Sequence, residues 1–162
     1  MKTIFSMAFL ALVLLIETSF AGEAENALMA AIRNRDVNAV KAALEKGADA
    51  NGKFNGRPIL AIAAGMGQLA VVEAMLAKGA DVNTKGNGGT TALMLAAGQK
   101  DIAIVKLLLD KGADVNAIDM YKASAVWHAA EGGQTAAIKL LLEKGADPNG
   151  LDSMGRTPLF RA

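Results

Sequence analysis

Residues 91–116 read TALMLAAGQKDIAIVKLLLDKGADVN, and most of the chain is a set of variations on this stretch. Its last five residues recur with small changes at Gly47–Asn51, Gly79–Asn83, Gly112–Asn116 and Gly145–Asn149. The leading glycines lie 32, 33 and 33 residues apart. A fixed period of this length predicts stacked structural units rather than one globule.

The stretch itself predicts two helices joined by a turn. The hydroxyl of Thr91 is a cap for a first short helix, and the carboxylate of Asp101 is a cap for a second helix that begins at Ile102. Gly112 fits the left-handed residue that ends a helix. The second helix is apolar on most of its circumference, so it requires a neighbour on each flank.

This pattern is similar to the ankyrin repeat, whose consensus is D-x-x-G-x-T-P-L-H-x-A-A-x-x-G-H-x-x-V-V-x-L-L-L-x-x-G-A-D-V-N. The resemblance runs from Glu25 to the C-terminus. It implies an all-α fold, an ankyrin-repeat solenoid of helix-turn-helix units joined by β-hairpin loops. The ankyrin-repeat domain is then residues 22–162, with approximate repeats at 25–51 (an N-terminal cap), 52–83, 84–116, 117–149 and a partial repeat at 150–162.

Several positions depart from the consensus. Pro58 replaces the usual threonine of repeat two, which removes a cap hydroxyl, and Lys122 replaces a usual glycine of repeat four. In the cap repeat we expect Asn26 and Asp36 to begin the two helices. The Asn-Gly pairs at 51–52, 55–56, 87–88 and 149–150 are hairpin signals.

The family's motif histidine is replaced by an apolar residue in every repeat. The residues at these positions are Met29, Ala61, Met94, Trp127 and Phe160. One interpretation is that hydrophobic packing replaces the histidine's hydrogen bonds at the base of the hairpins. The other is that Met94, Trp127 and Phe160 form an apolar strip facing the concave groove.

Residues 1–21 have the three-part form of a secretory signal peptide. Lys2 supplies a positive charge, and Ile4–Ile16 is an apolar run that contains only one polar residue, Ser6. Ser19 and Ala21 are small residues that predict cleavage after Ala21, and cleavage after Ala24 is the second choice. The run is shorter than the roughly 20 residues that span a bilayer. An uncleaved membrane or amphipathic helix is the alternative. We therefore expect a periplasmic or secreted protein, in the periplasm of a Gram-negative bacterium, with no membrane association after cleavage.

Composition argues against several other functions. Removing residues 1–21 leaves a formal charge of +1, which gives no electrostatic case for binding nucleic acid. The chain has no cysteine and a single histidine, His128, so we expect no metal, no cofactor and no catalytic residues. His128 is expected to be packed and neutral, and the repeated Asp49, Asp81, Asp114 and Asp147 are expected to serve turn hydrogen bonds.

The resemblance implies a non-enzymatic protein-protein interaction module whose hairpin tips and concave groove hold a partner protein of unknown identity. The alternative is a regulatory or inhibitory accessory subunit of an exported enzyme. Carried over by position, the candidate contact residues are Phe54, Asn55, Arg57, Met66, Asn87, Thr90, Gln99, Met120, Tyr121, Glu131, Ser153, Met154 and Arg156.

The fifth repeat ends within its first predicted helix, at Ala162. The leucine-rich helix of repeat four is then only half covered. Either the sequence is truncated or minimally capped there, or a partner or a second copy covers the open edge. We expect a monomer or a weak homodimer through this open C-terminal repeat.

Overall fold

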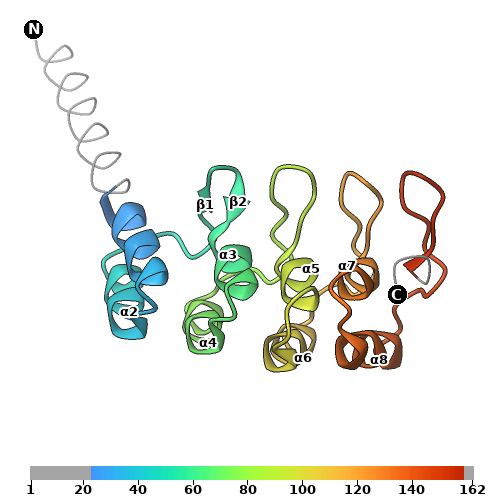
Figure 1. Cartoon of the computed structure of the whole chain (residues 1–162). Helices are drawn as coiled ribbons and strands as arrows, with labels where there is room; N and C mark the ends of the chain where they lie inside the picture. Colours follow the sequence, from blue (N-terminus) through green and yellow to red (C-terminus); the bar gives the residue numbers. More distant parts are fainter. Residues whose placement is uncertain (1–22, 159–162) are drawn as a thin grey trace, which may run out of the picture. The chain divides into compact units, whose positions relative to one another are not determined.

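The computed structural model describes residues 23–158 (Figure 1). The chain divides into two compact units, one through Asp49 and one from Ala50. In this described part, no helix has both the length and the apolar character needed to cross a membrane. The predicted signal peptide at residues 1–21 lies outside the described residues.

The first unit contains a helix over residues 23–33 and helix α2, Val37–Glu45. Asp36 caps α2 as predicted, since its Oδ1 accepts a hydrogen bond from the backbone N–H of Ala39 at 3.0 Å. The predicted cap at Asn26 is wrong, because this residue lies inside the first helix. The glutamates and alanine that precede Asn26 favour helix and carry it further upstream.

The second unit is built from one short β-hairpin and three pairs of helices. Its elements are β1 Lys53–Phe54, β2 Arg57–Pro58, α3 Ile59–Gly65, α4 Leu69–Ala77, α5 Ala92–Ala97, α6 Ile102–Asp110, α7 Ala125–Glu131 and α8 Thr135–Glu143. Helices α3, α5 and α7 contact one another in sequence, as do α4, α6 and α8. The two rows lie beneath a row of loops (Figure 1), so the predicted all-α solenoid is confirmed.

The inner row of helices packs closely because its facing residues are small. Alanines at 63, 64, 96 and 97 are at most 1% exposed. At the ends of α5 and α7, a Cβ added to Gly132 would lie 2.6 Å from the carbonyl oxygen of Gly98. Only glycine fits at position 132 at this separation.

Side-chain caps begin two of the three inner helices. Thr91 Oγ1 accepts from the N–H of Met94 at 3.4 Å, and Ser124 Oγ accepts from the N–H of Trp127 at 3.5 Å. Helix α3 follows Pro58 and has no side-chain cap, as the proline predicted. Asp101 caps the outer helix α6 as predicted, by accepting from the N–H of Ala103 at 2.9 Å.

The loop of repeat two is a paired hairpin, with Lys53 opposite Pro58 and Phe54 opposite Arg57. Its two turn residues, Asn55 and Gly56, have φ values of +51° and +74°. This is the turn that the Asn-Gly pair at 55–56 predicted, whereas the pairs at 51–52, 87–88 and 149–150 do not connect paired strands in the described residues. The later loops lack named strands in the described part. Each later loop is closed instead by a backbone hydrogen bond between residues four apart. In repeat four, the N–H of Asp119 donates to the carbonyl of Ala123 at 3.1 Å.

Asparagines that end successive GADxN motifs join one repeat to the next. Asn83 Oδ1 accepts from the N–H of Asp114 at 2.8 Å, and its Nδ2 donates to the carbonyl of Gly112 at 3.1 Å. Asn116 makes the same pair of bonds to Asp147 at 3.0 Å and Gly145 at 3.1 Å. The aspartates bond within their own turns, as predicted, for example from the N–H of Asn116 to Asp114 Oδ1 at 3.0 Å.

The loop tips are joined by a second set of bonds. The N–H groups of Asn87, Met120 and Ser153 each donate, at 2.7 Å, to a carbonyl of the preceding tip. The acceptors are Gly56, Gly88 and Tyr121. Neighbouring tips are therefore held in register by backbone hydrogen bonds, and glycines such as Gly86 and Gly89 allow the close approach of one tip to the next.

Candidate functional site

Two sets of equivalent positions, 33 residues apart, face the space between the loops and the inner helices. One set follows the loop turns and contains Arg57, Thr90, Ala123 and Arg156. The other lies on α3, α5 and α7 and contains Ile62, Leu95 and His128. Together they line a concave groove.

The groove has two adjoining hollows. The larger encloses about 380 Å³ and the smaller about 220 Å³. Arg57 and Leu95 line both, so the hollows meet at these two residues. The larger hollow reaches from repeat two to the loop of repeat five.

The structure brings most of the predicted contact residues to this groove. Arg57, Thr90, Tyr121, Glu131, Ser153, Met154 and Arg156 line the larger hollow, whereas Met66 and Gln99 join Arg57 around the smaller one. The remaining four residues, Phe54, Asn55, Asn87 and Met120, lie at the loop tips outside both hollows.

The tips of repeats four and five expose large apolar side chains. Met120, Tyr121 and Met154 are 67%, 61% and 74% exposed. Tyr121 and Met154 also line the larger hollow, so the apolar tip surface is continuous with the groove wall.

Asp152 and Arg156 form a compact ion pair at one end of the larger hollow. Arg156 Nε and NH2 approach Asp152 Oδ2 at 2.8 and 2.6 Å, and Asp152 Oδ1 accepts from the N–H groups of Met154 and Arg156. The side-chain hydrogen bond from Arg156 lowers the pKa of Asp152 and outweighs the opposing effect of burial. The charge of Arg156 is therefore already matched within its own loop.

Asp119 plays the same part in repeat four. Its Oδ1 accepts from the N–H groups of Tyr121 at 2.8 Å and Ala123 at 3.0 Å, and its Oδ2 lies 3.3 Å from His128 Nε2. His128 is half-buried and packs edge-on against Trp127, with ring centroids 6.1 Å apart. The prediction of a packed histidine holds, although its carboxylate neighbour was not foreseen.

The motif positions that carry apolar residues are mostly interior. Ala61 and Met94 are at most 1% exposed, which favours hydrophobic packing at the base of the loops over an apolar strip. Trp127 differs, because it is 7% exposed and lines the larger hollow, where the Arg156 guanidinium lies 5.8 Å from its ring centroid. Phe160 lies outside the described residues.

Sequence reasoning missed Leu95, Asp119 and Asp152 as groove residues. The repeat period could have identified Leu95 as a groove residue, because Ile62, Leu95 and His128 occupy the same position of the 33-residue period. Across residues 23–158, no three His, Cys, Asp or Glu side chains gather as a metal site.

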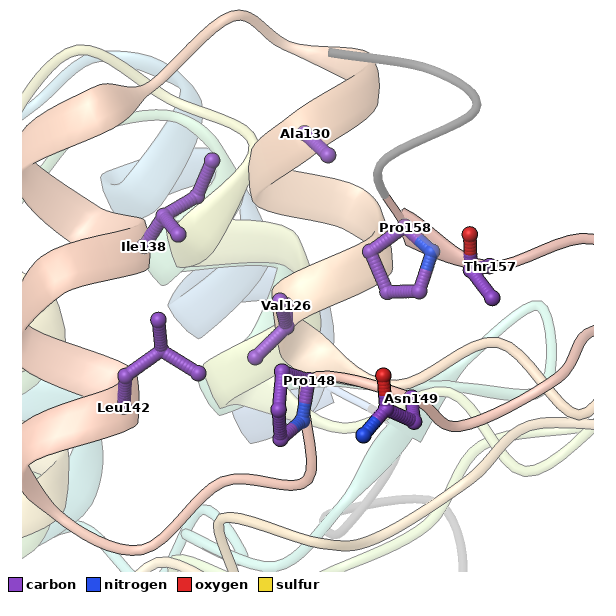
Figure 2. Close-up of a pocket in the computed structure, with 8 residues that line it drawn as sticks. All are labelled: Val126, Ala130, Ile138, Leu142, Pro148, Asn149, Thr157 and Pro158. Atoms are coloured by element: carbon purple, nitrogen blue, oxygen red, sulfur yellow. The ribbon is translucent and has the colours of Figure 1, made fainter.

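A separate hollow of about 430 Å³ lies between α7, α8 and residues 148–158 (Figure 2). Val126 and Ala130 of α7 form one wall, Ile138 and Leu142 of α8 another, and Pro148, Asn149, Thr157 and Pro158 complete it. We call this the C-terminal edge. Leu142 is 40% exposed there.

A family model described as "Ankyrin repeats (3 copies)" matches residues 8–86 and 93–162. The two ranges cover most of the chain and contain every described groove residue except Thr90. The first range overlaps residues 8–21 of the predicted signal peptide. No curated protein matches the chain.

Proposed function

The chain belongs to the ankyrin-repeat family, and we propose that it is an exported, non-catalytic module that binds a partner protein through its loop tips and concave groove. Ankyrin repeats are generally protein-protein interaction modules and typically act as non-catalytic scaffolds. The partner, the compartment and the contact residues are our proposal.

One observation supports the contact surface above all others. Residues from four successive repeats converge on one groove, and its rim exposes Tyr121 and Met154. Aromatic residues, methionine and arginine are enriched in protein interfaces. Tyr121 and Met154 lie on the same rim rather than singly on separate faces, which favours a contact surface there.

The groove is suited to binding because it is formed in advance. The tip-to-tip backbone bonds and the asparagine bridges fix the spacing of the repeats without help from a partner. A surface that is already ordered loses little conformational entropy on association. Affinity can then come from a few side chains on a rigid frame.

Photocrosslinking tests the binding surface. We expect benzoylphenylalanine placed at Tyr121 to capture a partner protein in the source cells, and the same residue placed at Lys106 on the outer helix α6 to capture none. Equal capture at both positions, or capture at neither, would overturn the proposal. If the captured protein is an exported enzyme whose rate changes on binding, the module is its regulatory or inhibitory subunit.

The proposal of export to the periplasm rests on residues 1–21 and on the absence of cysteine from the whole chain. We expect the mature protein to fractionate with the periplasm and to begin after Ala21. A mature protein that starts at Met1 in the cytoplasm would contradict this.

We propose that self-association is at most weak and uses the C-terminal edge. Leu142→Glu places a carboxylate among its apolar residues and is expected to leave a strict monomer by static light scattering. A dimer that survives this change would place the contact elsewhere.

A further inference from the structure

Arg57 and Arg156 occupy the same position of the repeat, three periods apart, and both line the larger hollow. The two guanidinium groups differ in whether the chain places a carboxylate beside them. Arg156 is held by Asp152, four residues before it, through Nε and NH2. Four residues before Arg57 the chain has Lys53, which cannot take that role. Within residues 23–158, Arg57 makes no ion pair.

His128 also lies close to a carboxylate, since its Nε2 is 3.3 Å from Asp119 Oδ2. The two ends of the groove therefore differ. At the end formed by repeats four and five, Asp119 contacts His128 and Asp152 pairs with Arg156. At the end formed by α3 and α5, Arg57 stands exposed among Ile62, Met66 and Leu95.

A partner that covers Arg57 removes water from its guanidinium. An uncompensated charge that loses its hydration destabilises a complex, whereas a carboxylate placed on it forms paired, charge-assisted hydrogen bonds. Arginine is suited to planar carboxylate recognition. The acid that would match Arg57 is missing from its own loop, so a partner has to supply it.

The opposite end of the larger hollow presents apolar side chains beside the Asp152–Arg156 ion pair. Trp127 forms part of its wall, and Tyr121 and Met154 stand at its rim. Arg57 precedes α3 and Trp127 lies on α7, two helix spacings away. At about 8–10 Å per spacing the separation is roughly 20 Å, which is about six residues of extended chain.

We propose, on the basis of the function proposed above, that the groove binds an extended segment of the partner protein that places an aspartate or glutamate on Arg57 and, about six residues away, an apolar or aromatic side chain against Trp127. The carboxylate replaces the acid that the repeat-two loop lacks. The apolar side chain extends the contact already made by Tyr121 and Met154.

Selection from a random 12-residue peptide library displayed on phage tests this inference. On the wild-type protein we expect enriched sequences with an acidic residue at a fixed spacing from an apolar one. On Arg57→Glu we expect that acidic preference to disappear and a lysine or arginine preference to replace it. Lys106→Glu on α6 makes the same charge change outside the groove and is the matched control, expected to select the wild-type sequences.

The affinity of a synthetic peptide taken from the wild-type selection measures the contribution of Arg57. We expect Arg57→Glu to weaken its binding about 10- to 100-fold, as loss of a charge-assisted pair implies. Changing the peptide's acidic residue to lysine should restore binding to Arg57→Glu. Circular dichroism melting curves of the variants confirm that each is folded.

Enriched peptides without an acidic residue, or an acidic preference unchanged in Arg57→Glu, would overturn the inference and leave the protein-binding function standing. Selection that enriches no peptide would overturn the inference in the same way, because the proposed ligand is a linear segment. Failure of the proposed function is seen separately, as absence of a crosslinked partner at position 121.

Discussion

The asparagine bridges give the sharpest test of how the repeats hold together, because the chain contains a matched pair. Asn116 Oδ1 accepts from the N–H of Asp147 at 3.0 Å, and its Nδ2 donates to the carbonyl of Gly145 at 3.1 Å. Asn149 ends the following motif with the same residue in the same kind of turn, since its N–H also donates to an aspartate Oδ1, at 2.8 Å. Within the described residues, its amide has no following repeat to bridge.

The expected cost of Asn116→Ala follows from the two bonds lost. Each hydrogen bond contributes about 0.5–1.5 kcal/mol net, and these are exposed, so the sum is about 1.5 kcal/mol. At roughly 4 °C per kcal/mol for a domain of this size, the melting temperature should fall by about 6 °C. Asn149→Ala removes an amide without such partners and should change stability by less than about 0.5 kcal/mol.

Thermal and urea unfolding followed by circular dichroism measure both variants, and hydrogen exchange adds a local readout. In Asn116→Ala the Asp147 amide should exchange faster, because Asn116 Oδ1 is its acceptor. Equal destabilisation by the two variants, or an Asp147 amide that keeps its protection, would refute the view that these side chains bind one repeat to the next.

Three further predictions follow from local geometry. Gly132→Ala should lower stability by about 1–3 kcal/mol in thermal unfolding, because the added Cβ would lie 2.6 Å from the Gly98 carbonyl oxygen. Gly98→Ala is the control, since its Cβ would lie 3.5 Å from its nearest neighbour, and it should be neutral or slightly stabilising in the same assay. Lys122→Gly should raise stability by about 0.5–1 kcal/mol in urea unfolding, since Lys122 has φ +59° and the relief of strain exceeds the added chain entropy; an unchanged midpoint would contradict this. Arg156 lowers the pKa of Asp152 below its usual 3.8, so the stability that this carboxylate contributes is present above that pH and lost as the pH falls through the lowered pKa. Asp152→Asn should therefore be less stable than wild type at neutral pH, and the two should become equally stable in acid unfolding. A stability difference that persists in acid would argue against the ion pair as its source.

The sequence predicted features that depend on neighbouring residues. Thr91, Asp101 and Asp36 cap helices because the bonds they make reach only two or three residues along the chain. The left-handed Gly112, with φ +85°, follows from the same local chemistry. Asn26 was misassigned because helix-favouring residues upstream outweigh a polar side chain that can also be accommodated within a helix.

Features that depend on stacking were not predicted. The bond from the N–H of Asp114 to Asn83 joins residues 31 apart, and nothing in either motif shows which neighbouring repeat it will meet. Likewise the contact between His128 and Asp119 depends on how the loop folds back over α7. Predicted contact residues that lie just after a loop turn, such as Arg57 and Thr90, do line the groove. The reason is that the backbone hydrogen bonds between tips fix this position in every repeat.

The same bonds explain how one scaffold can carry a specific groove. The residues that hold the repeats together are backbone groups, glycines and the motif asparagines, and none of them needs a particular side chain at the groove position. That position is Arg57, Thr90, Ala123 and Arg156 in successive loops, so its chemistry changes while its place does not. Where an acid accompanies the arginine, as at Asp152, the charge serves the loop's own fold. Where Lys53 stands instead, Arg57 has no ion pair within residues 23–158, and this is the charge that we propose an acid of the partner matches.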